Sequence, residues 1–139
     1  MLKSFLDLQQ RELDSLGEER GQLRERLSRE ELRGERLGGL YDELSRQRGP
    51  AHPLHWQNRH GLRQQVQNLM HHQQQQTNLA RLDLAHHEQQ LLRQFGKVKG
   101  LQQVVAQREA EAEASRQSRE QKQLDELALQ AFIRRRQAR

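Results

Sequence analysis

The histidines are the residues with the clearest capacity for chemistry, because a neutral imidazole is a common metal ligand. The seven histidines are His52, His55 and His60, then the adjacent pairs His71-His72 and His86-His87. Adjacent residues on a helix point about 100° apart, so such a pair cannot easily share one ion. The i, i+4 spacing that would bring two imidazoles together is missing from the expected helices, and the first two histidines have no carboxylate or thiolate nearby. We expect solvated histidines, no metal site and no cofactor.

The hydroxyl groups give no better basis for catalysis. The serines Ser4, Ser15, Ser28 and Ser45 lie in polar segments that lack the turn presenting a nucleophile, and no glycine-rich phosphate loop is visible. A pair of helices also lacks the concave site in which substrates are desolvated. The sequence therefore predicts a protein that is not an enzyme.

Cationic side chains suggest a binding function instead. The net charge is +5, the excess of Lys and Arg falls on residues 49–108, and Arg134, Arg135 and Arg136 form a cluster near the end. This charge permits nucleic-acid binding, but aromatic residues make up only 4% of the chain and no dense basic region precedes a leucine zipper. An arginine cluster also complements a helix dipole and suits acidic protein surfaces. A basic coiled coil that binds nucleic acid or self-associates stays an alternative.

Two prolines indicate how these residues are positioned. Pro50 and Pro53 are the only prolines in a chain rich in Leu, Gln, Arg and Glu, which favour helix. Gly49 can end a helix just before them. We predict an all-α fold, a long antiparallel two-helix coiled-coil hairpin forming a single domain over 1–139. Its first helix is expected at about 2–48, its turn at about 49–54 and its second helix at about 55–136.

A seam of apolar residues runs along the first predicted helix. Alternating steps of four and three residues from Leu2 reach Leu6, Gln9, Leu13, Leu16, Arg20, Leu23, Leu27, Glu30, Gly34, Leu37, Tyr41 and Leu44. Such a 3.5-residue repeat keeps one face towards a partner helix. Arg20, Glu30 and Gly34 weaken its middle.

The second predicted helix has a less regular seam. It follows one track only if two four-residue stutters are allowed. That track is Leu62, Val66, Leu69, Gln73, Gln76, Ala80, Leu84, His87, Leu91, Phe95, Val98, Gln102 and Val105.

The position of the turn predicts a C-terminal helical overhang. If the chain turns near residue 51, residue n lies opposite about 103 − n, so residues from about 102 onward have no internal partner. This segment carries an apolar face at i, i+3, i+4, i+7 and i+8. Its members are Leu124, Leu127, Ala128, Ala131 and Phe132. An apolar face with nothing of its own to cover indicates binding to another protein, or else self-association.

Several segments together resemble a known family. They are residues 119–128 with Phe132 and Arg134 to Arg136 behind them, the segment Leu40 to Leu44, and Trp56 just after the turn. In these features and in length the chain resembles the flagellar export protein FliJ and its type III secretion relatives. The resemblance spans nearly the whole chain and does not distinguish the flagellar from the injectisome system.

The resemblance implies a non-enzymatic central stalk of the export apparatus. Such proteins insert into the hexameric ring of the export ATPase, promote its assembly, link it to the cytoplasmic domain of the export-gate protein, and handle export chaperones. The place implied is the cytoplasm, peripheral to the inner membrane, and we expect no transmembrane segment. The implied ATPase-binding residues are Gln121, Leu124, Asp125, Leu127, Ala128, Ala131, Phe132, Arg134, Arg135 and Arg136.

The resemblance also implies a gate-binding patch near the hairpin tip. Its residues would be Leu40, Tyr41, Leu44, Leu62, Val66 and Leu69. Leu62 stands where the family usually has an aromatic residue, so the chain departs from the family pattern at this position. The alternative is that most of these residues, Leu40 excepted, belong to the seam that holds the hairpin together.

Overall fold

The computed structural model describes residues 1–46 and 53–138, and two helices form nearly all of this part. Helix α1 is Leu2–Arg46 and helix α2 is Pro53–Ala138. No strand occurs among the residues described. The all-α prediction is confirmed.

The ends of the helices differ slightly from those expected. Helix α2 begins at Pro53, two residues before the predicted start, because the fixed φ of proline suits a first helical turn. It continues to Ala138 instead of ending at residue 136. The predicted end of the first helix at 48 and residues 49–52 of the turn predicted at 49–54 lie outside the described residues, while the last two residues of that turn are helical.

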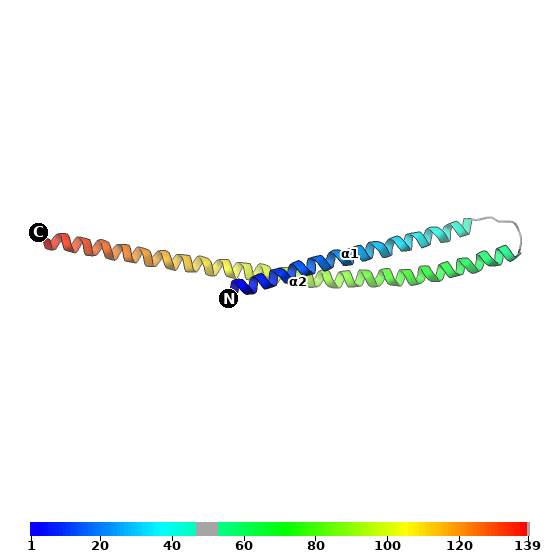
Figure 1. Ribbon diagram of the computed structural model, residues 1–139, viewed down its shortest axis with the longest axis horizontal. Coiled ribbons are helices and arrows are strands. Elements are labelled where there is room, and N and C mark those ends of the chain that lie inside the picture. The colour runs from blue at the N-terminus through cyan, green and yellow to red at the C-terminus, as the bar shows by residue number, and fades with distance from the viewer. Residues whose placement is uncertain (47–52, 139) are drawn as a thin grey trace. The chain divides into compact units, whose positions relative to one another are not determined.

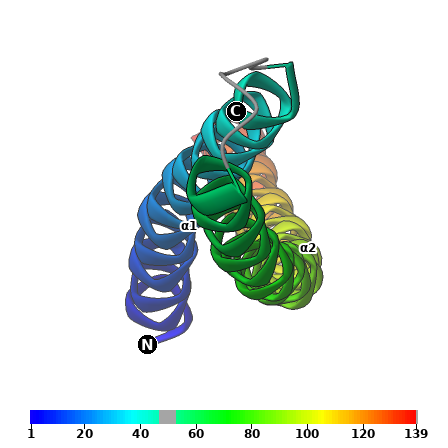
Figure 2. The same cartoon turned by 90° about the vertical axis from the view of Figure 1, so that its right-hand side faces the viewer.

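The chain divides into two compact units. One combines Met1–Gln10 with Gly96–Arg139, and the other is Arg11–Phe95. Within Arg11–Phe95, α1 and α2 lie side by side and run in opposite directions (Figure 1). Seen from the end at which α2 begins, the two helices of this unit are inclined to each other (Figure 2), as in a coiled coil. The helical hairpin is confirmed, while the single domain remains a prediction.

The seam predicted for the first helix is confirmed position by position. All thirteen predicted residues, from Leu2 to Leu44, are partly or fully covered, and Gln9 is buried. Beyond these positions, only Gln10, Arg26 and Gly38 of α1 are partly covered. The polar residues Arg20 and Glu30 therefore keep their places in the seam although they cost apolar contact.

The seam predicted for the second helix is partly wrong. Leu62, Leu69 and Phe95 are 46%, 53% and 47% exposed, and Gln102 is exposed as well. The regular covered positions are Arg59, Arg63, Val66, Met70, Gln73, Thr77, Ala80, Leu84, His87, Leu91, Gln94, Val98, Leu101 and Val105. They alternate by four and three without a stutter. A continuous helix cannot rotate locally to bury one leucine without disturbing the turns on either side, so the 3.5-residue repeat prevails over the hydrophobicity of single residues.

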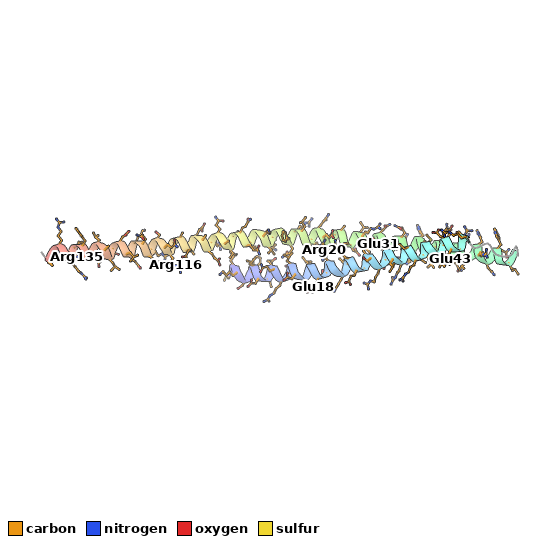
Figure 3. The ribbon with its side chains drawn as sticks, turned by 90° about the horizontal axis from the view of Figure 1, so that it is seen from above. Glu18, Arg20, Glu31, Glu43, Arg116 and Arg135 are labelled. Carbon is orange, nitrogen blue, oxygen red and sulfur yellow. The ribbon has the colours of Figure 1, made fainter. Side chains whose placement is uncertain are left out.

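The C-terminal segment, Ala106–Ala138, has only exposed side chains. Its start lies slightly beyond the predicted residue 102, because Val105 is still partly covered and Lys3 reaches Glu109 with an Nζ–Oε1 distance of 2.6 Å. The hydrogen bond to Glu109, with its negative charge, raises the pKa of the Lys3 ammonium. In Figure 3 the side chains of Arg116 and Arg135 stand out from α2. The predicted overhang is therefore a long stretch of exposed helix whose contact with α1 is the ion pair between Glu109 and Lys3 near its start.

Candidate functional site

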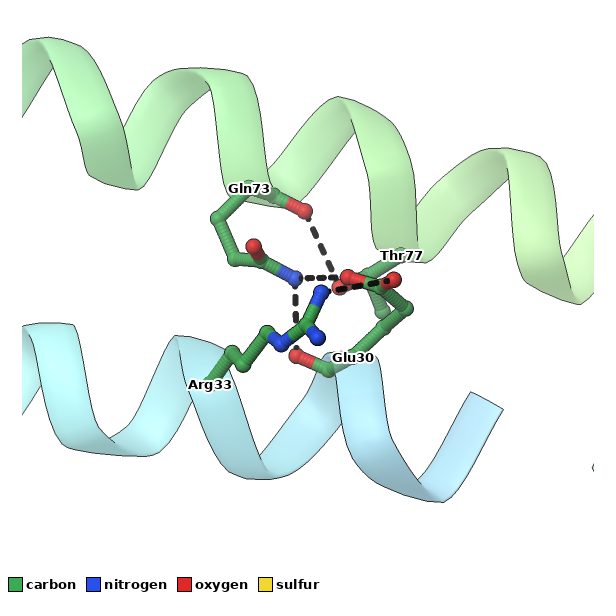
Figure 4. Close-up of polar contacts among 4 residues, drawn as sticks. All are labelled: Glu30, Arg33, Gln73 and Thr77. Carbon is green, nitrogen blue, oxygen red and sulfur yellow. Dashed lines mark hydrogen bonds and ion pairs between the residues drawn. The ribbon is translucent and has the colours of Figure 1, made fainter. Parts of the chain in front are cut away.

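Polar residues occupy the middle of the interface between the helices in Arg11–Phe95. Gln73 donates hydrogen bonds from Nε2 to the main-chain carbonyl oxygen of Glu30, at 2.9 Å, and to its carboxylate (Figure 4). The Thr77 hydroxyl donates to the carbonyl oxygen of Gln73 at 3.0 Å, and Arg33 pairs with Glu30 at 3.4 Å. Polar groups in a coiled-coil seam fit one alignment of the helices better than its neighbours. This cluster specifies the register.

His87 contributes a second polar contact in the same interface. It is 6% exposed, with Nε2 2.7 Å from the Leu16 carbonyl oxygen and Nδ1 3.7 Å from a carboxylate oxygen of Glu19. The expectation of solvated histidines is therefore wrong for His87. Its place in the 3.5-residue repeat accounts for its burial.

The histidines do not assemble a metal site in the part of the chain that the structure describes. No group of three or more His, Asp or Glu side chains there could hold an ion. His60 instead stacks on Trp56, with ring centroids 5.4 Å apart. His52 and the side chain of His55 lie outside the described residues.

Ion pairs between the helices flank the seam. Arg20 pairs with Glu88 at 3.2 Å and Arg26 with Asp83 at 3.0 Å. All four side chains are substantially exposed, so each pair contributes at most about 1 kcal/mol. The contacts of Gln73 with Glu30 and of His87 with Leu16 join residues whose numbers sum to 103, whereas the two ion pairs sum to 108 and 109. Residue n of α1 therefore lies opposite 103 − n to 109 − n of α2, at or a few residues beyond the register that the turn position predicts.

The predicted ATPase-binding residues all lie in the C-terminal segment. Leu124, Leu127 and Phe132 are 62%, 61% and 62% exposed. The remaining seven are exposed too: Gln121, Asp125, Ala128, Ala131, Arg134, Arg135 and Arg136. Gln121 donates to Asp125 at 3.2 Å, so these two side chains are engaged with each other. The helix brings the ten residues into one continuous stretch of surface.

Two apolar residues of the same surface were missed. Leu129 is 59% exposed and Ile133 is 45% exposed. Their i, i+4 spacing forms a second row beside the stripe from Leu124 to Phe132. That spacing was the signal that could have identified them. The exposed apolar surface is wider than the predicted stripe.

The predicted gate-binding patch separates into two sets. Tyr41, Leu44 and Val66 belong to the seam, and Val66 is only 3% exposed. Arg63 lies over the Tyr41 ring, 5.6 Å from its centroid. These three residues therefore occupy seam positions, as the alternative expects, and their role in gate binding stays a prediction.

The other three residues of that patch are exposed on one edge of the hairpin. Leu40, Leu62 and Leu69 are 44%, 46% and 53% exposed, and each directly precedes a covered position. Arg26 and Asp83 also precede covered positions and are bonded across the helices. Residues that hold this position in the repeat, on α1 and on α2, therefore meet at the same edge of the hairpin. We call Leu40, Leu62 and Leu69 the edge patch.

These features define an all-α protein whose predicted binding residues lie on the surfaces of its helices. No helix of the described part is apolar over a length that could cross a membrane. The family model described as Flagellar FliJ protein matches residues 1–137 of the 139-residue chain. The chain belongs to this family and is a component of the flagellar protein export apparatus. The family comprises stalk or adaptor proteins and not known enzymes. Comparisons with curated proteins and with solved structures return no match.

Proposed function

We propose that the chain is a central stalk whose C-terminal segment inserts into the hexameric ring of the export ATPase and promotes ring assembly. The observation that carries this proposal is the exposure of Leu124, Leu127 and Phe132 on a helix whose side chains are all exposed from residue 106 to 138. Burial of such apolar surface against another protein is favourable. A ring lumen would cover several faces of the helix, which suits the two rows of apolar residues.

Arginines at the end of this segment would require acidic groups on the ATPase ring. Arg134, Arg135 and Arg136 are exposed in consecutive positions, so their guanidinium groups point in different directions around the helix. They would pair with acidic groups distributed around a lumen. Arginine suits this role because its planar group can bind carboxylates with two hydrogen bonds.

The edge patch is the proposed contact with the cytoplasmic domain of the export-gate protein. Leu40, Leu62 and Leu69 lie on both helices yet share one edge, so a single partner surface could cover all three. Tyr41, Leu44 and Val66 would support this contact indirectly, by holding the helices together beneath it.

The stalk would then join the ATPase ring to the export gate at the cytoplasmic face of the inner membrane. Its association with the membrane would be peripheral and would pass through these partners. We propose that empty export chaperones bind the same protein.

The ATPase proposal is tested by stimulation of the purified export ATPase. Leu124→Asp or Phe132→Asp should abolish the rise in ATPase activity and in ring assembly that the wild-type chain produces, because each places a charge in the apolar contact. Leu82→Asp is the matched control, since Leu82 is 66% exposed on the same helix but outside the segment. Equal activity of all three variants, with helicity unchanged, would contradict insertion through this segment.

The gate proposal is tested by binding to the isolated cytoplasmic domain of the gate protein. Leu62→Asp with Leu69→Asp should weaken binding at least tenfold and leave ATPase stimulation unchanged. Leu79→Asp is the control, because Leu79 is 49% exposed on α2 and is not part of the edge patch. Wild-type affinity of the double variant would exclude the edge patch from this contact.

A further inference from the structure

A groove lies along the edge of Arg11–Phe95 opposite to the edge patch. Its volume is about 770 Å³, and its apolar lining comes from Leu13 of α1 and from Leu91, Leu92 and Phe95 of α2. Leu92 is 71% exposed and Phe95 is 47% exposed. These side chains present apolar surface at a place where most coiled coils carry charged pairs.

Gly17 lines the groove on the α1 side and fills none of it with a side chain. A Cβ atom built on Gly17 would meet nothing within 4 Å. Glu31 and Arg81 occupy the positions equivalent to Gly17 and Phe95, two heptads further along the same edge. They form an ion pair between the helices with a nitrogen–oxygen distance of 3.4 Å. The glycine leaves no such bridge above Leu13 and Leu91.

Acidic groups border the groove on the α1 side. Asp14 and Glu18 line it, together with Arg20 and Glu88. Arg20 and Glu88 are paired with each other at 3.2 Å, so their charges largely cancel. The border is therefore net negative through Asp14 and Glu18.

We propose that this groove binds the C-terminal helix of a second copy of the chain. That helix is complementary to the groove. Its exposed Leu127 and Phe132 would contact the apolar lining, and the cations Arg135 and Arg136 would face the acidic border. The small side chain of Ala131 allows close approach of the helix backbone. Docking of an amphipathic helix into an apolar groove between two helices is a common mode of recognition.

The groove is separate from the proposed ATPase and gate surfaces, whereas the C-terminal helix that would enter it also carries the proposed ATPase contact. The contact between copies is therefore tested on the full chain alone, without the ATPase. Sedimentation equilibrium should show the mass rising from 16.5 kDa towards about twice that value as concentration increases, since closed dimers are the commonest symmetric assemblies. A mass that stays at 16.5 kDa at all concentrations up to about 200 µM, the range of weak specific contacts, would overturn the proposal.

Charge exchange identifies the contact within such a dimer. Asp14→Lys with Glu18→Lys should raise the dissociation constant at least tenfold, and Arg135→Glu with Arg136→Glu should do the same. All four changes in one chain should restore association, because the charges again oppose one another. Failure of the combined variant to recover would overturn the pairing.

Filling the groove gives an independent test. Gly17→Gln should abolish association, whereas Gly39→Gln should not, although both side chains enter open space on α1 and both favour helix. Circular dichroism should show unchanged or higher helicity for both variants. Wild-type association of Gly17→Gln would overturn the proposal. The proposal would also be overturned if the wild-type chain were monomeric and the Gly17→Gln variant lost ATPase stimulation. That result would assign the groove to a different partner.

Discussion

His87 of α2 donates a hydrogen bond to the main-chain carbonyl oxygen of Leu16 in α1, with the two atoms 2.7 Å apart. A carbonyl oxygen can only accept, so the proton lies on Nε2 of the imidazole. The contact crosses the interior of Arg11–Phe95 at a regular position of the seam, and His87 is 6% exposed. A shift of α2 along α1 would remove the acceptor from reach. His87 therefore favours the observed register at some cost in apolar contact.

Replacement of His87 by leucine should stabilise the hairpin and weaken its register. We expect His87→Leu to raise the free energy of unfolding by about 1 kcal/mol, because added apolar burial exceeds the loss of one hydrogen bond. Thermal or urea unfolding followed by circular dichroism measures this change. A less stable variant would mean that the hydrogen bond to Leu16 outweighs a leucine contact.

The corrected seam of α2 predicts opposite sensitivities for two neighbouring residues. Met70 is partly covered, whereas Leu69 is 53% exposed. Met70→Gln should lower the free energy of unfolding by about 1 to 2 kcal/mol through lost apolar burial, while Leu69→Gln should change it by less than about 0.5 kcal/mol. The two variants are compared in the same urea unfolding experiment. A larger loss for Leu69→Gln would support the seam with stutters instead.

These two residues also explain how far the sequence could predict the packing. In α1 the apolar residues themselves follow the 3.5-residue repeat, so counting from Leu2 located the whole seam. In α2 the covered positions include Gln73, Thr77, His87 and Gln94. Several leucines of α2 lie beside the seam, so a seam predicted from hydrophobicity alone departs from the covered positions.

The candidate surfaces were predictable to different extents. The unpaired C-terminal segment followed from the position of the prolines, because the turn leaves arms of unequal length. The groove beside Gly17 could not be predicted in this way. It depends on which residue of α2 lies opposite Gly17, and that relation required the corrected seam that places Phe95 at the edge.

Gly34 is a site where the helix can be made more stable without loss of fit. It occupies a seam position of α1, and a Cβ atom there would lie 3.9 Å from Cγ of Gln73, an ordinary contact distance. None of the described glycines has a positive φ, so alanine adopts this backbone without strain. Gly34→Ala should raise the free energy of unfolding by about 1 kcal/mol. A drop in the unfolding midpoint would show that the Gln73 to Glu30 hydrogen bonds require the glycine.

Deletion of residues 110–139 separates folding of the hairpin from its proposed action on the ATPase. The deletion keeps the ion pair between Lys3 and Glu109 and removes only side chains that are exposed in the described part of the chain. Exposed helical side chains without tertiary contacts contribute little to the stability of the remainder. The truncated chain should therefore unfold at a midpoint within a few degrees of the wild-type value but should not stimulate the export ATPase. Deletion of only 137–139 is the control and should retain stimulation. A marked fall in the midpoint would mean that the C-terminal segment packs on the hairpin, and retained stimulation by the longer deletion would exclude the segment as the stalk.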